Sequence, residues 1–166
     1  MESQHLYKKI LFPTDFSESS NDAIPQVMNL AKTYASALVI LYTFRFNDAF
    51  LDHKNIREAK MNREMKAAHQ FKLIDEQYLQ GSGLQYAFQA EVGFSSDRIL
   101  FNIQEHNINL LILSTTMQKA LREGYPNLLA EISCPVLVIS KRCGGSDQGF
   151  EWQLLEQPIL SERNKN

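Results

Sequence analysis

The sequence has few of the residues that mark disulfide-bonded, metal-binding or membrane-spanning proteins. Its 166 residues include two cysteines, Cys134 and Cys143, which are too few for a disulfide scaffold and form no Cys-x-x-Cys pair. The four histidines show no recognisable metal-ligand spacing. No run of about 18 apolar residues occurs, and no apolar leader follows Met1. These absences predict a protein of the reducing cytoplasm with no metal and no membrane partner.

Positive charge is not in excess. Lysine and arginine number 17 against 19 acidic residues, so the formal net charge is -2. Nucleic-acid-binding domains usually carry a basic excess, and we therefore expect no nucleic-acid partner. The cations between residues 54 and 72 are interrupted by carboxylates, which favours a solvated, ion-paired helix surface over an RNA platform.

Apolar runs typical of buried strands alternate with segments of helical periodicity. Strands are expected at residues 9–13, 37–44, 85–92, 110–113 and 135–139. Helices are expected after a cap at Ser17, Ser19 or Ser20, over 55–79, from Ser95 or Ser96, and over 118–132. The second helix has a predicted core face made of Ile56, Ala67, Phe71, Ile74 and Tyr78. This alternation predicts an α/β fold whose parallel sheet has helices on both faces.

The composition changes after the last predicted strand. Residues 1–142 are expected to form one domain, and residues 143–166 a linker with an apolar tail. Cys143 to Gly149 is rich in glycine and serine, as flexible linkers are. Phe150 to Leu155 is apolar again and contains the only tryptophan, Trp152.

The first strand and the turn after it carry a specific pattern, Ile10-Leu11-Phe12-Pro13-Thr14-Asp15-Phe16-Ser17. It resembles the opening of the universal stress protein family. Three further matches follow in the family's order, at residues 92–100, 108–113 and 133–139. The resemblance implies a doubly wound five-stranded sheet in the order 3-2-1-4-5, of the adenine nucleotide alpha hydrolase-like type. It also implies a role in stress responses, and a homodimer.

The ligand crevice of an open α/β sheet lies at the carboxyl ends of the strands, where strand order reverses. For the implied order, that point lies between the first and fourth strands. The candidate ligand-binding residues there are Pro13, Thr14, Asp15, Tyr42, Thr43, Phe44, Ser114, Thr115 and Thr116. The resemblance implies that Asp15 contacts the adenine and ribose side of a nucleotide. Alternatively, Asp15 only braces the turn into the first helix.

The glycine loop that holds phosphates in ATP-binding members of the family is missing. Those members carry a glycine, two residues, a second glycine, nine residues, and then glycine with serine or threonine. Ser114 and Met117 stand at the first two glycine positions here, and Tyr125 follows Gly124. A methionine side chain obstructs the close approach of backbone N–H groups to phosphate.

We therefore expect a regulatory or binding protein without catalytic residues, which does not bind ATP in the family's usual mode. The alternative is a sensor of ATP or AMP with at most slow hydrolysis. The hydroxyls of Ser114, Thr115 and Thr116 could hold a smaller anion with Lys119, although capping of the next helix is the favoured interpretation. A third interpretation is an interaction protein whose crevice is empty and whose tail engages another protein.

The fifth strand is expected to form a sheet edge. Its unpaired backbone and apolar side chains offer a template for pairing, and many family members dimerise through it. The predicted interface residues are Val136, Leu137, Val138, Ile139 and Trp152. The apolar tail could fold back onto its own sheet or cross to the partner as an exchanged arm.

Overall fold

A six-stranded sheet forms the centre of the computed structural model, which describes residues 7–46, 53–142 and 149–155. The strands are β1 (Lys9–Thr14), β2 (Ala37–Phe44), β3 (Tyr86–Val92), β4 (Leu110–Ser114), β5 (Val136–Lys141) and β6 (Phe150–Leu155). Their order is β3-β2-β1-β4-β5-β6, and the first five pair in parallel. The predicted doubly wound sheet is confirmed, with a sixth strand added to it.

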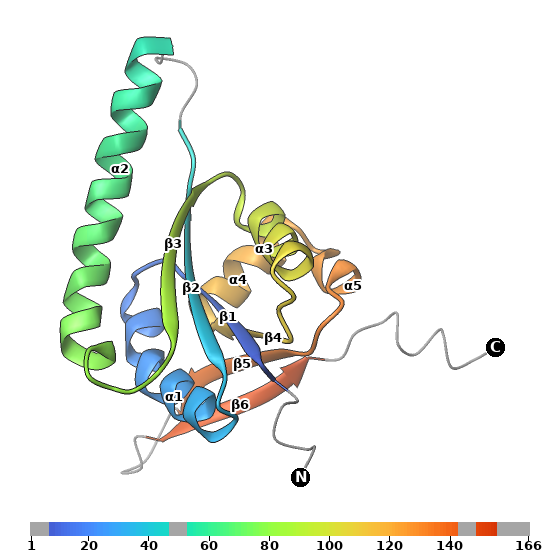
Figure 1. Cartoon of the computed structure of the whole chain (residues 1–166). Helices are drawn as coiled ribbons and strands as arrows, with labels where there is room; N and C mark the ends of the chain where they lie inside the picture. The colour runs from blue at the N-terminus through green and yellow to red at the C-terminus, as the bar shows by residue number, and fades with distance from the viewer. Residues whose placement is uncertain (1–6, 47–52, 143–148, 156–166) are drawn as a thin grey trace.

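Helices cover both faces of the sheet (Figure 1). They are α1 (Glu18–Thr33), α2 (His53–Ile74), α3 (Ser95–Glu105), α4 (Thr115–Gly124) and α5 (Leu128–Glu131), and a π-helical turn, Asp75–Leu79, extends α2. Ile10 and Phe12 pack in the core beneath α1 and α2, whereas Leu11 packs beneath α3, α4 and α5. Because central strands are buried on both faces, they read in the sequence as continuous apolar runs.

The N-terminal half of α2 rises beyond the ends of the strands (Figure 1). In its lower half Ala67 and Ile74 are buried and Phe71 is half-buried, as is Tyr78 in the turn that follows. Ile56 is 37% exposed, so its assignment to the core face is wrong. The periodicity of a helix marks a face but does not show how far the sheet reaches beneath it.

β6 pairs antiparallel with β5. Val136 lies opposite Leu155 at one end of the pairing, and Lys141 lies opposite Phe150 at the other. The expectation that β5 forms the sheet edge is wrong, because β6 of the same chain occupies that edge. Trp152 lies opposite Ile139 and is 38% exposed. Residues 143–148 and 156–166, which belong to the predicted linker and chain end, lie outside the described residues.

Two local predictions have different outcomes. Of the three candidate caps of α1, Ser17 is the one that the structure shows, since its side chain accepts a hydrogen bond from the Ser20 N–H. The expected helix over 118–132 is instead two helices. The first, α4, begins directly after β4 and ends at Gly124, and the second, α5, covers Leu128–Glu131. Among residues 7–46, 53–142 and 149–155, no helix has both the length and the hydrophobicity that a bilayer span requires.

Candidate functional site

The strand order reverses beside β1, which pairs with β2 on one side and with β4 on the other. Pro13, Thr14 and Asp15 stand at the carboxyl end of β1, and residues 114–116 follow the end of β4. The structure brings these two groups together, as the sequence predicts. Thr14 and Ser114 are both buried at this position.

The turn after β1 has an unusual backbone. Phe16 has φ 58°, in the left-handed region that non-glycine residues seldom adopt. Its N–H donates to Thr14 Oγ1 at 3.0 Å, and its ring packs 4.9 Å from Tyr42 and 6.0 Å from Phe88, measured between centroids. These contacts hold the turn and aim the chain into α1.

Asp15 is bound by the first turn of α1. Its Oδ1 accepts from the Ser17 N–H at 3.0 Å, the Ser17 hydroxyl at 2.5 Å and the Ser20 hydroxyl at 2.7 Å. Partial burial acts to raise the pKa of Asp15, but hydrogen bonds from Ser17, Ser20 and Thr116 together outweigh it and hold the pKa below its usual value. Asp15 therefore stays ionised and braces the turn.

Hydroxyl groups from α1 meet hydroxyl groups from α4. Ser17 Oγ lies 3.0 Å from Thr116 Oγ1, Ser19 Oγ lies 2.8 Å from Thr115 Oγ1, and Ser20 Oγ lies 2.9 Å from Ser114 Oγ. We call these six side chains the hydroxyl bridge. It joins the N-termini of two helices across the point where a ligand crevice is expected.

The hydroxyl bridge depends on where α4 starts. Ser114 ends β4 and is also the N-cap of α4, accepting from the Met117 N–H at 3.3 Å. Met117 is buried in the core beneath α4. Sequence reasoning missed Ser17, Ser19 and Ser20 as partners of the β4 end. The available signal was two hydroxyl-rich runs, each directly after one of two adjacent strands.

The three candidate residues of β2 lie apart from the hydroxyl bridge. The ring of Tyr42 packs against Phe16, while Thr43 Oγ1 lies 2.5 Å from Ser95 Oγ. The predicted cap of α3 by Ser95 or Ser96 is thus wrong, because the N-cap is Phe94 and has no side-chain cap. A cavity of about 300 Å³ is lined by Thr43, Phe44, Arg45, Gly93, Phe94, Ser95, Ser96, Ala120, Leu121, Gly124 and Tyr125.

An acidic side chain of β3 holds α3 beside this cavity. Glu91 accepts from Arg98 at 2.6 Å and from the fully buried Asn102 at 2.8 Å. Between β3 and α3, Gly93 turns the chain with φ 142°, and a Cβ at this position would lie 3.0 Å from Arg98 Cδ. Glycine is therefore required at the turn, and the Glu91 cluster fixes one wall of the cavity.

Cys134 has the character of a buried apolar residue. It is 5% exposed, and this burial raises the pKa of its thiol to about 11. The thiol is therefore protonated at neutral pH and is a poor nucleophile. Within the described part of the chain, no three His, Cys, Asp or Glu side chains are grouped as metal ligands.

Comparison with known proteins identifies the family. The model of the universal stress protein family matches residues 6–140. The chain belongs to the universal stress protein family. Universal stress protein MJ0531 of Methanocaldococcus jannaschii is 24% identical over 148 residues, which span 83% of this chain and 85% of that protein.

Solved structures share the fold. Hypothetical protein MJ0577 superposes with a TM-score of 0.66 at 22% identity, covering 84% of this chain and 99% of its own. A universal stress protein family protein of Arabidopsis thaliana, solved with AMP bound, has a TM-score of 0.58 at 12% identity. The match covers 85% of this chain and 97% of the Arabidopsis chain. Family membership indicates a function in stress responses.

Proposed function

We propose that this chain is a non-enzymatic regulatory protein of the stress response, which does not bind ATP in the family's usual mode. The hydroxyl bridge is the observation that supports this proposal. Its side chains satisfy one another across the crevice, so a ligand would have to break contacts of 2.8–3.0 Å between α1 and α4. Because α4 begins directly after β4, the backbone there is committed to a helix.

Charge also disfavours a triphosphate at this position. The ionised carboxylate of Asp15 already accepts from the first turn of α1, where a phosphate would otherwise be stabilised by free N–H groups and the helix dipole. A triphosphate brought to the same place would be repelled by that carboxylate. The crevice thus carries an internal anion instead of a phosphate site.

Calorimetric titration of ATP into the full chain is expected to give no binding tighter than about 1 mM. Ser19→Ala is the matched control for Asp15→Ala, because it removes one half-buried member of the hydroxyl bridge and leaves Asp15 in place. Micromolar ATP affinity in the unmodified chain, lost in Asp15→Ala, would contradict the proposal.

Asp15→Asn is expected to lower the free energy of unfolding at pH 7 by about 1 kcal/mol, the scale of one solvent-screened charged hydrogen-bond site. Since the folded-state pKa of Asp15 is depressed, its stabilisation is present above the unfolded pKa of about 3.9 and is lost as pH falls through the folded value. Urea unfolding should therefore show a gap between the two proteins that closes below about pH 4. Asp97→Asn, another exposed carboxylate at a helix start, is the control; a gap that persists at pH 2 contradicts this role.

A second candidate function, an adenine-nucleotide sensor, is favoured by the cavity beside β2. Phe94 and Tyr125 offer exposed rings, Arg45 lies 4.0 Å above the Phe94 ring, and the volume of about 300 Å³ is at the small end for ligand sites. The Arabidopsis relative of the same fold was solved with AMP. Binding of AMP that is lost in Phe94→Ala, with the hydroxyl bridge intact, would support this candidate.

Members of the family commonly form homodimers, and we propose that this chain does so too. Pairing through the backbone of β5 would require β6 to leave, since β6 holds that edge in register from Val136 to Lys141. We therefore expect the dimer interface of the full chain on a different surface.

A further inference from the structure

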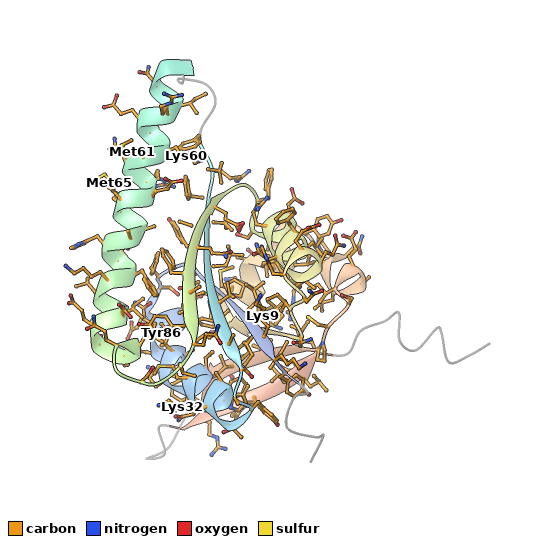
Figure 2. All side chains as sticks on the ribbon, viewed as in Figure 1. Lys9, Lys32, Lys60, Met61, Met65 and Tyr86 are labelled. Carbon is orange, nitrogen blue, oxygen red and sulfur yellow. The ribbon has the colours of Figure 1, made fainter. Side chains whose placement is uncertain are left out.

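Large apolar side chains stand exposed on α2. Met61 is 56% exposed, Met65 64% and Leu73 56%. Residues four apart form a ridge along a helix, and the ridge through Met61 and Met65 reaches Leu73 by way of His69. Figure 2 shows Met61 and Met65 on the part of α2 that rises beyond the strands.

This ridge faces away from the sheet. Met65 and the buried Ala67 are two residues apart, which places their side chains about 200° apart around the helix axis. A shallow hollow lined by Met65, Lys66, His69 and Gln70 runs beside the ridge. A ridge of one helix next to a groove is the arrangement in which two helices pack.

The charges on the neighbouring ridge show which partner fits. They read Lys60, Glu64, Ala68, Lys72 and Glu76, with ion pairs of 3.7 Å between Lys60 and Glu64 and of 3.9 Å between Lys72 and Glu76. When two copies of this ridge run in opposite directions and are centred on Ala68, each charge of one copy meets a charge of opposite sign on the other. A second α2 running the opposite way places Glu64 opposite Lys72, and Lys60 opposite Glu76.

We propose that α2 pairs antiparallel with α2 of a second copy of this chain, centred near Met65 and Ala68. Residues 55–66 carry four cations and two carboxylates, whereas residues 67–79 carry one cation and two carboxylates. An antiparallel pair therefore sets the basic half of each helix against the acidic end of the other, and a parallel pair sets like against like. The inference names an interface for the proposed homodimer and rests on that proposal.

The geometry permits this pairing. Because the buried face of α2 lies on the sheet and the ridge lies opposite it, the two sheets would stand on opposite sides of the helix pair. The two-fold arrangement is closed, so it gives a dimer and not a filament. The methionines supply contact area, since unbranched side chains adapt to a facing groove.

Sedimentation equilibrium of the full chain over a range of concentrations tests the interface. The unmodified chain should show a monomer–dimer equilibrium, and Met65→Glu should raise the dissociation constant by about tenfold or more. Gln104→Glu adds the same charge at an exposed site on α3 and should leave it unchanged. A monomer at all concentrations overturns both the homodimer and this interface. A dimer indifferent to Met65→Glu overturns the interface alone.

A charge exchange tests the orientation. Glu64→Lys and Lys72→Glu should each weaken the dimer, because each sets like charges opposite one another in an antiparallel pair. The double variant carries the exchanged charges on both copies and should recover the dissociation constant to within about twofold. Additive weakening in the double variant would overturn the antiparallel arrangement.

Discussion

Ending the chain at Arg142 is expected to lower the free energy of unfolding by about 3 kcal/mol, because the deletion uncovers β5 and the apolar side chains that β6 shields. Ile139 is 1% and Val138 3% exposed in the intact sheet, and Leu155 packs against the core on the α4 side. At about 2–4 °C per kcal/mol for a chain of this size, the melting temperature should fall by roughly 10 °C. Urea and thermal unfolding measure both quantities.

A chain that ends at Leu155 is the matched control, since it retains β6 and loses only the residues beyond it. If that shorter deletion costs as much stability as ending at Arg142, the effect does not come from β6. The same comparison tests the uncovered edge: with Met65→Glu present to suppress pairing through α2, the chain ending at Arg142 should associate through β5. The control with the same substitution should remain monomeric.

The sequence contains the signal for β6 but not its pairing. Phe150, Trp152 and Leu154 alternate with Glu151 and Gln153, which is a strand pattern. A pattern of period two does not specify which edge a strand joins, and that depends on tertiary structure. The five parallel strands were predictable because alternating strands and helices, together with right-handed crossovers, leave few topologies.

The candidate site was likewise predictable from the sequence only in part. Asp15 and Ser114 lie together because topology alone brings the ends of β1 and β4 to one place. The hydroxyl bridge was not predictable, because serine and threonine at helix starts suit capping, ligand binding and mutual hydrogen bonds equally well. The contact of Ser20 with Ser114 at 2.9 Å follows from the start of α4 at Thr115, which the sequence placed several residues later.

Replacing Glu91 with alanine is expected to lower the free energy of unfolding by about 2–3 kcal/mol, because it leaves a largely buried guanidinium and a buried amide without their acceptor. The side chains of Arg98 and Glu91 are 27% and 19% exposed, and Asn102 is fully buried. The cost should exceed that of Glu105→Ala, which removes an exposed carboxylate from α3, the helix that carries Arg98 and Asn102. Urea unfolding of the two variants makes the comparison.

A double-mutant cycle then separates the ion pair from the rest of the cluster. If Glu91 acts through Arg98, the pair Glu91→Ala and Arg98→Ala should show a coupling of about 1 kcal/mol or more. If the cost arises chiefly at Asn102, whose Nδ2 donates to both Glu91 and the Arg98 carbonyl, the coupling with Asn102→Ala should be the larger one. A Glu91→Ala cost no greater than that of Glu105→Ala would contradict a structural role for the cluster. Gly93 and Phe94 line the cavity beside β2 and lie between β3 and α3, the two elements that Glu91 joins. Loss of the Glu91 contacts should therefore also weaken the binding of any ligand in that cavity.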